Sequence, residues 1–158
     1  MKLKRIDQLE LWEMIKEHEL WLTEQGDEED PVTGHVVHPV RAVFRNMDLS
    51  DLDFTNRTCG EIIQRDMQWS KFIGCRLWNC NMEGVDFTNA EIERCDFRMT
   101  NLRDATFCMT KLFGNNFAKA KMWNVELDVG KITLCTLNLA EGIETLWSVS
   151  NRPRFVTK

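Results

Sequence analysis

The sequence lacks any apolar stretch of the roughly 18 residues that a membrane-spanning helix needs. Its first residues, MKLKRIDQLELW, carry charge throughout and contain no hydrophobic segment of the signal-peptide kind. With 158 residues, 43% of them hydrophobic, the chain has room for one domain with a core. We therefore expect one cytoplasmic domain, located in the host cytoplasm if the gene belongs to a phage.

Motifs of catalysis and cofactor binding are also missing. There is no glycine-rich phosphate loop, no nucleophile elbow and no constellation of two carboxylates that stands out. Histidine is scarce, and the pair His35 and His38 has no thiols at ligand spacing, so it is a weak indication of a metal site. We predict a protein that is not an enzyme and holds no cofactor or metal.

What the sequence does have is a period of five, in which every fifth residue is apolar without a miss. The series is Ile62, Met67, Phe72, Leu77, Met82, Phe87, Ile92, Phe97, Leu102, Phe107, Leu112, Phe117, Met122, Leu127, Ile132 and Leu137. Two residues before each stands a small or β-branched residue, except for Arg65 and Asn115. A period of five fits neither a helix nor a simple strand, so the chain must turn a corner once per repeat. Two side chains of every five then point inward.

Quintets such as VDFTN, CDFRM and TNLRD resemble the pentapeptide-repeat family, whose consensus is close to A-(D/N)-L-x-x. The resemblance covers 60–139 and extends backward through AVFRN, MDLSD and LDFTN at 42–56, centred on Phe44, Leu49 and Phe54. It implies an all-β solenoid, a right-handed quadrilateral β-helix with four quintets per coil. Residues twenty apart would then stack at about 4.8 Å.

Stacking at this interval predicts four inward columns. They are Ile62/Met82/Leu102/Met122, Met67/Phe87/Phe107/Leu127, Phe72/Ile92/Leu112/Ile132 and Leu77/Phe97/Phe117/Leu137. Between Phe54 and Ile62 the count of five is interrupted. We expect three extra residues there, forming a bulge or small loop around Arg57–Cys59.

The register also assigns most of the cysteines. Cys75, Cys80, Cys95 and Cys135 occupy the small inward position, where a thiol behaves as a compact apolar group. Cys75 and Cys95 should stack on adjacent coils, close enough for a disulfide, although a reduced pair is favoured without export signals. Cys108 is expected to point outward.

The N-terminal residues follow a different pattern. Residues 1–25 read as an amphipathic helix that Asp7 could cap. Its apolar stripe is predicted to be Ile6, Leu9, Trp12, Ile15, Leu20, Trp21 and Leu22. We interpret this helix as a lid over the N-terminal end of a β-helix at 42–139. Residues 26–41 are predicted to be an acidic loop, and a helix followed by repeats resembles phage and prophage members of the family.

The last coil places Val129, Leu134 and Leu139 on its outside, and Phe113 lies at an outward position just before it. So much apolar surface in one zone has to be covered. Residues 140–158 could fold back as a C-terminal cap or tail. Alternatively, two chains could meet end to end as a homodimer, because the known gyrase-protecting members of the family dimerise through their C-terminal ends.

The resemblance also implies a function. Family members of known role mostly mimic DNA, with acidic side chains in place of phosphates. The net charge is −5, and one predicted face carries Asp66, Asp86, Glu126 and Asp128. We therefore predict a phage-type inhibitor that blocks the DNA site of a host DNA-handling protein, such as a nuclease, a topoisomerase or a CRISPR-type defence complex.

The alternative is a protein-binding scaffold that uses exposed aromatic residues rather than charge. Trp69, Trp78 and Trp123 are its candidate contacts. Direct binding to nucleic acid is disfavoured, since the chain is acidic and its basic faces lack interleaved aromatics. In either hypothesis the partner is a bacterial protein.

Overall fold

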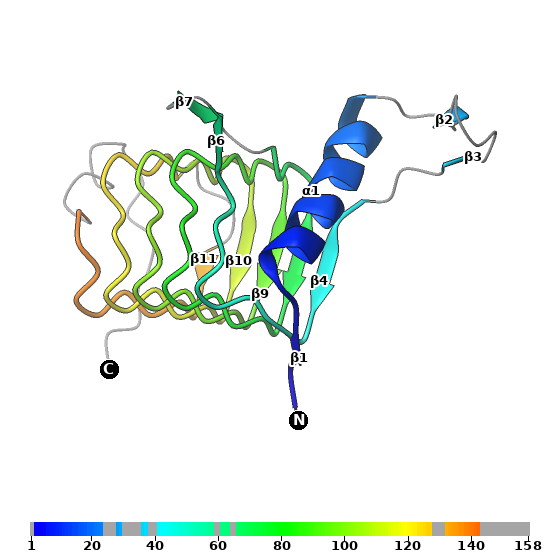
Figure 1. Cartoon of the computed structure of the whole chain (residues 1–158). Coiled ribbons are helices and arrows are strands. Elements are labelled where there is room, and N and C mark those ends of the chain that lie inside the picture. The colour runs from blue at the N-terminus through cyan, green and yellow to red at the C-terminus, as the bar shows by residue number, and fades with distance from the viewer. Residues whose placement is uncertain are drawn as a thin grey trace.

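A computed structural model describes the backbone of residues 2–23, 28–29, 36–37, 41–58, 61–63, 66–127 and 132–142. Side chains are described for 2–23, 41–55, 66–127 and 132–142. These residues form one helix, α1 (Gln8–Thr23), and a tower of stacked coils (Figure 1). Among the described residues, no helix has the length and apolar character needed to cross a membrane.

One side of the tower is a five-stranded parallel sheet in the order β11-β10-β9-β8-β4. Its strands are β4 (Val43–Arg45), β8 (Lys71–Ile73), β9 (Glu91–Glu93), β10 (Lys111–Phe113) and β11 (Ile132–Thr133). Phe72 pairs with Ile92, and Ile92 pairs with Leu112. Partners from β8 onward therefore lie twenty residues apart, which confirms the predicted four quintets per coil.

Between successive coils, the other three sides carry single parallel pairs in place of full strands. In chain order from the sheet side, these pairs join the series Arg76–Asp96–Asn116–Thr136, Asn81–Asn101–Lys121–Glu141 and Asp66–Asp86–Thr106–Glu126. We call them the second, third and fourth sides. The second side comprises 47–51, 75–79, 95–99, 115–119 and 135–139. The third side comprises 52–55, 80–84, 100–104, 120–124 and 140–142. The fourth side comprises 66–69, 85–89, 105–109 and 125–127. The molecule is thus a quadrilateral β-helix.

The apolar residue of each quintet fills the tower axis. Phe72, Leu77, Phe87 and Phe97 have no exposed surface, and the small residue two positions earlier is buried as well. The predicted phenylalanine stacks are confirmed, with ring centroids 5.0 Å apart for Phe87 and Phe107 and 4.9 Å apart for Phe97 and Phe117. Two side chains of every five therefore pack inward, and stacked aromatic rings fill much of the interior.

The interruption is larger than predicted, and the expected place of Ile62 is wrong. β6 (Asn56–Thr58) and β7 (Glu61–Ile63) pair antiparallel with each other and project from the coils (Figure 1). Asp53 pairs with Asn81, which places Phe54, not Ile62, next to Met82 in its column. Partners in this coil are twenty-eight residues apart, so the insertion is eight residues rather than three. Ile62 keeps the period of five by count alone, because its backbone pairs within the hairpin.

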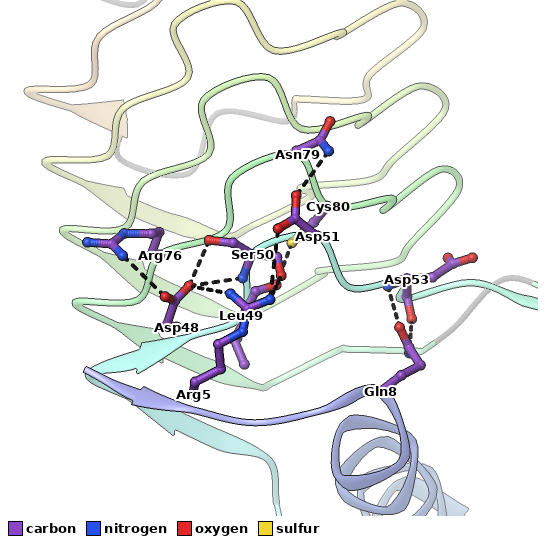
Figure 2. A network of polar contacts seen from close by, with 10 residues as sticks. All are labelled: Arg5, Gln8, Asp48, Leu49, Ser50, Asp51, Asp53, Arg76, Asn79 and Cys80. Carbon is purple, nitrogen blue, oxygen red and sulfur yellow. Dashed lines mark hydrogen bonds and ion pairs between the residues drawn. The ribbon is translucent and has the colours of Figure 1, made fainter. Parts of the chain in front are cut away.

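The chain before the tower is attached to the first coil by backbone and side-chain contacts. β1 (Lys4–Arg5) pairs parallel with β5 (Met47–Asp48). Gln8 donates from Nε2 to the Asp53 carbonyl and accepts from the Asp53 N–H at Oε1, both at 2.7 Å (Figure 2). In the segment predicted to be an acidic loop, β2 (Glu28–Glu29) and β3 (Val36–Val37) pair antiparallel.

Helix α1 is capped as predicted, but its buried stripe differs from the expected one. Asp7 Oδ1 accepts hydrogen bonds of 2.9 Å from the N–H groups of Leu9 and Glu10. The buried residues are Leu11, Ile15 and His18, whereas Leu9 and Trp12 are 67% and 39% exposed. The predicted stripe left out Leu11, because several registers on this apolar-rich helix have helical spacing and only packing on the first coil decides between them.

His18 lies fully buried where α1 meets the tower. Its Nδ1 accepts the Ala42 N–H at 3.2 Å, so the ring is neutral with its proton on Nε2, and the ring stacks on Trp21. Burial lowers the pKa of His18 to about 4, and the nearby Arg41 adds to the effect. The neutral ring is therefore part of the contact between helix and tower.

The corner between the sheet side and the second side is built from a column of Cys75, Cys95, Asn115 and Cys135. The Cys75 N–H donates to Cys95 Sγ at 3.4 Å, which confirms the expected stacking, and the described cysteines are free thiols. Asn115, an exception in the sequence pattern, is buried in the same column. Its Oδ1 accepts the Cys95 N–H at 2.9 Å and its Nδ2 donates to the Ile92 carbonyl at 2.8 Å. The amide thus satisfies two buried backbone groups.

We predict that Asn115→Ala lowers the free energy of unfolding by about 1–3 kcal/mol, because it leaves those two backbone groups unpaired. Asn115→Cys is the matched control, since a thiol at this position repeats the contact that Cys95 makes with Cys75. It should retain more stability than the alanine variant. Denaturant unfolding of the three proteins measures the difference, and equal losses in both variants would contradict the assigned role.

We also predict that His18 makes stability depend on pH. A histidine whose folded pKa is lowered contributes stability that is present above its unfolded pKa of 6.5 and is lost as the pH falls toward about 4. The loss should reach about 3 kcal/mol at pH 4. Unfolding of wild type and His18→Gln is compared from pH 7 to pH 4, so that the titration of other groups cancels. A difference that does not change with pH would contradict this prediction.

Candidate protein-binding surface

The predicted acidic column exists in the structure. Asp66, Asp86 and Glu126 lie on successive coils of the fourth side, with Thr106 between the second and the third of them. Each stands directly before an apolar residue of the axis, so its side chain leaves the tower. Asp66 and Asp86 are half-buried and Glu126 is exposed. Asp128, the remaining residue of this set, lies outside the described residues.

Aspartate has a structural reason to occupy this position. Asp66 Oδ1 accepts the Gln68 N–H at 3.0 Å, and Asp86 Oδ1 accepts the Thr88 N–H at 2.8 Å. Asp53 on the third side makes the same contact with the Thr55 N–H at 2.8 Å. This local bond holds the backbone at the start of the turn. One oxygen of each carboxylate is thereby used within the tower, and the other is directed elsewhere.

Two like charges on neighbouring coils are held together by an amide. Gln68 donates from Nε2 to Asp66 Oδ2 at 3.3 Å and to Asp86 Oδ2 at 3.1 Å. The pKa of Asp66 is raised, first by burial and then by the charges of Asp86 and Glu19. The column is therefore a set of interacting carboxylates.

Charge pairing divides the tower into two halves. On the sheet side and the second side, which we call the paired half, every described carboxylate has a basic partner within 4.0 Å. The tightest examples are Lys71–Glu91 at 2.8 Å and Arg98–Asp96 at 2.9 Å, and Asp48 is shared by Arg5 and Arg76 (Figure 2). These charges are neutralised where they stand.

The third and fourth sides form what we call the acidic half. Their carboxylates are Asp53, Glu83, Asp104, Glu141, Asp66, Asp86 and Glu126, and their only bases in the described sequence are Arg103 and Lys121. None of these carboxylates forms an ion pair with a base in the described part of the chain. The sequence shows which acids share the fourth side, but it does not show that they have no basic partner.

The three candidate tryptophans do not form one surface. Trp69 is 48% exposed at the edge of the fourth side. Trp78, on the second side, packs between the guanidinium groups of Arg76 and Arg98, at 5.0 and 4.2 Å from its ring. Trp123, on the third side, lies 5.4 Å from Arg103. Only Trp69 presents a largely open ring.

The outward apolar residues are more widely spread than the sequence analysis expected. Phe113, Leu134 and Leu139 are exposed by 43%, 59% and 77%, while Val129 lies outside the described residues. Met99 and Met109, at 49% and 60%, were not predicted. Like Leu134 and Leu139 they occupy the corner position of the quintet with positive φ. A search for apolar residues at this position would have found them.

We predict that Asp86→Asn lowers the pKa of Asp66 toward its ordinary value, because the substitution removes a neighbouring negative charge. The asparagine oxygen still accepts the Thr88 N–H, so the turn is retained. Carboxyl-carbon chemical shifts followed from pH 2 to 7 measure the effect. Asp96→Asn on the second side is the control and should leave Asp66 unchanged, whereas an equal effect of both variants would contradict the contact.

Comparison with known proteins agrees with this architecture. The family model for pentapeptide repeats matches residues 66–104 with eight copies. The structure of QnrB1, a plasmid-mediated fluoroquinolone resistance protein, superposes with a TM-score of 0.51 at 17% identity, covering 72% of this chain and 53% of that one. The chain thus spans about half the length of QnrB1, and at this identity the likeness shows the fold alone.

Two further pentapeptide-repeat structures overlap less well. Rfr23 from the cyanobacterium Cyanothece 51142 has a TM-score of 0.30 at 15% identity, covering 65% of this chain and 85% of its own. A thylakoid-lumen protein of Arabidopsis thaliana has a TM-score of 0.21 at 17% identity, covering 60% and 61%. Comparison with curated proteins finds no match. The matched repeats and the four-sided stack of twenty-residue coils together identify residues 66–104 as pentapeptide repeats.

Proposed function

We propose that the protein is a non-enzymatic inhibitor that presents the acidic half to the DNA site of a DNA-handling protein, in the place of DNA. The observation that carries this proposal is the difference in pairing between the two halves of the tower. Carboxylates with no base beside them keep their full field toward solvent and toward a basic groove. Those of the paired half are cancelled within 4.0 Å.

The strength of the mimicry follows from charge density. Coils repeat at about 4.8 Å, and the acidic half carries roughly one net negative charge per coil. Duplex DNA carries one charge per ~1.7 Å of its axis, so the acidic half has roughly a third of that density. Binding should therefore be sensitive to salt but weaker than that of DNA, unless apolar contacts such as Trp69 contribute.

The family and the fold guide the choice of target. QnrB1 has the same fold and is a fluoroquinolone resistance protein, and the gyrase-protecting members that this family includes bind a topoisomerase. We extend the candidate class to nucleases and CRISPR-type defence complexes, as expected of a phage-type inhibitor. Such targets are cytoplasmic, which is the location we propose for this protein.

The alternative is a scaffold that binds its partner through exposed apolar side chains. Trp69 favours it, being open and held at φ 62°, a backbone conformation that costs energy for a bulky residue. Met109 lies on the same corner as Trp69, two coils further along with Asn89 between them, whereas Met99 lies on another corner, so the apolar side chains of these corners do not form one continuous patch. The acidic half is the more continuous surface.

We expect the labelled protein to bind at least one of purified gyrase, a single-subunit topoisomerase and a nuclease, and to be displaced by duplex DNA. The triple variant Asp66→Asn, Asp86→Asn, Glu126→Gln should weaken binding by about tenfold or more, through loss of unpaired charge. Its control, Glu13→Gln, Asp51→Asn, Glu93→Gln, removes the same charge from α1 and the paired half. Fluorescence anisotropy at 50 and 300 mM salt measures the affinities.

Two outcomes would contradict the proposal. One is binding that survives the acidic triple variant and high salt but is lost on Trp69→Ala, which would favour the scaffold. The other is absence of binding to all three enzymes. Both asparagine substitutions keep the oxygen that holds the turn, so a loss of binding would not reflect a loss of fold.

We also propose a division of the chain into a helix at 1–25, an acidic segment at 26–41, the β-helix at 42–139 and a C-terminal cap or tail at 140–158. In this division α1 is the N-terminal cap. Its Leu11 and Ile15 are fully buried, and β1 supplies a partner to the edge of the first coil. An uncovered edge would offer unpaired backbone groups to other chains.

A further inference from the structure

The outward tryptophans of the tower differ in what covers their rings. Trp78 has a guanidinium on either side, that of Arg76 at 5.0 Å and that of Arg98 at 4.2 Å from the ring centre. Trp123 has one arginine at 5.4 Å. The ring of Trp69 has no such contact with a base in the described part of the chain, and the residue is 48% exposed. Trp69 therefore presents an open indole face to solvent.

Each arginine on Trp78 bonds a carboxylate at the same time. Arg98 donates from Nε to Asp96 Oδ1 and from Nη2 to Asp96 Oδ2, both at 2.9 Å. Arg76 donates from Nη1 to Asp48 Oδ2 at 3.2 Å. A guanidinium can make both contacts because its flat face meets the ring while its edge carries the N–H groups. The second side thus combines tryptophan, aspartate and arginine in one arrangement.

The fourth side has the tryptophan and the aspartates of this arrangement, but its described residues include no base. Asp66 and Trp69 belong to one quintet, and Gln68 between them bonds Oδ2 of Asp66 and Oδ2 of Asp86 at 3.3 and 3.1 Å. Arg41 donates from Nε to the Trp69 carbonyl, so it holds the backbone of this corner. The side therefore offers a ring and two carboxylates to a cation from elsewhere.

The backbone at Trp69 indicates that the fold does not require a tryptophan there. Its φ is 62°, a conformation that costs free energy for a bulky side chain. Asn89 holds the same corner one coil further on at φ 60°, and asparagine adopts this conformation more readily. The two corners are bonded alike, since the Trp69 N–H donates to the Thr88 carbonyl at 2.9 Å and the Asn89 N–H to the Cys108 carbonyl at 3.0 Å. A contact outside the chain explains the tryptophan better than folding does.

We propose that Trp69 receives an arginine side chain of the protein partner, with the guanidinium stacked on the indole ring and its charge balanced by Asp66 and Asp86. This inference rests on the proposed function and names the group that the acidic half recognises. Arginine fits better than lysine, because its flat and weakly hydrated cation stacks on a ring and still donates to carboxylates. DNA sites present such arginines to phosphates, so a partner bound in the place of DNA has this group to offer.

The first test titrates the protein with the peptide acetyl-Gly-Arg-Gly-amide at about 20 mM salt, where screening is weak. We expect the indole N–H resonance of Trp69 and the side-chain amide resonances of Gln68 to shift until saturation, while the indole resonances of Trp78 and Trp123 stay in place. The same peptide with citrulline, which is planar but uncharged, should not bind. Lysine in place of arginine should bind about two- to fivefold more weakly, because an ammonium stacks less well.

The second test uses Trp69→Asn to separate binding from folding. The variant should bind the arginine peptide at least about two- to fivefold more weakly, as followed by the Gln68 amide, and should unfold at the same or a higher denaturant concentration than wild type. Met109→Asn is the matched control, since Met109 stands on the same corner with φ 53° and is 60% exposed. It should leave peptide binding unchanged. Asp66→Asn/Asp86→Asn should weaken binding as Trp69→Asn does.

The proposal is overturned if the citrulline or the lysine peptide binds as tightly as the arginine peptide, or if Trp69→Asn binds the arginine peptide like wild type. If Trp69→Asn loses stability, Trp69→Leu decides, because it keeps an apolar side chain and should lose the preference for arginine over citrulline. Failure of the proposed function is seen separately, because the peptide tests need no DNA-handling enzyme. If the acidic triple variant abolishes enzyme binding while Trp69→Asn leaves it intact, only the arginine contact is overturned.

Discussion

Each coil must lie in register on the one before it, and the rest of the structure depends on this constraint. Backbone N–H groups such as those of Phe87 and Leu102 donate to the following coil at 2.8 Å, to residues nineteen positions on. Because the bonds are parallel and repeat every twenty residues, each side chain lies over its own equivalent. The interior then needs one large apolar and one small residue per quintet. Stacked rings such as Phe44 and Phe72, at 4.6 Å, satisfy this need.

The same constraint aligns the outward residues, and like charges would then stand at the distance between coils. The tower relieves this repulsion in three ways. On the sheet side the charge alternates, with Glu91 between Lys71 and Lys111 at 2.8 and 3.7 Å. On the third side amides are interleaved, since Asn81 donates to Asp53 and Asn101 to Asn81, both at 3.1 Å. On the fourth side Gln68 bridges two aspartates without removing their charge. Only the first of these cancels charge.

The period of five predicts the stacking of the coils, but it does not predict which side chains pair or which helix face packs on the tower. Three of the four predicted columns are correct, because quintets that share one register have one way to stack. The predicted place of Ile62 is wrong because Ile62 pairs within the β6–β7 hairpin and not with the next coil. The period of five does not distinguish these two kinds of pairing. The predicted buried face of α1 is wrong because Leu11 is buried by contact with the first coil. The helical period alone does not show which face of the helix makes that contact. The sequence predicts the aligned acids of the fourth side. It does not predict that they lack basic partners, because this depends on where each basic side chain lies.

This last difference matters for function more than the net charge of −5 does. A pair such as Arg98 and Asp96, at 2.9 Å, is a dipole whose field falls off steeply, whereas an unpaired carboxylate acts over about a Debye length of 8–10 Å. Counting charges on each face treats the two as equal and makes the tower look balanced. Once the paired charges cancel locally, an excess of acids is left on the third and fourth sides and an excess of bases, among them Arg45 and Lys119, on the other two. The repeat thus sets the positions at which charges can stand, and the choice between pairing and isolation at those positions decides which side a basic partner meets.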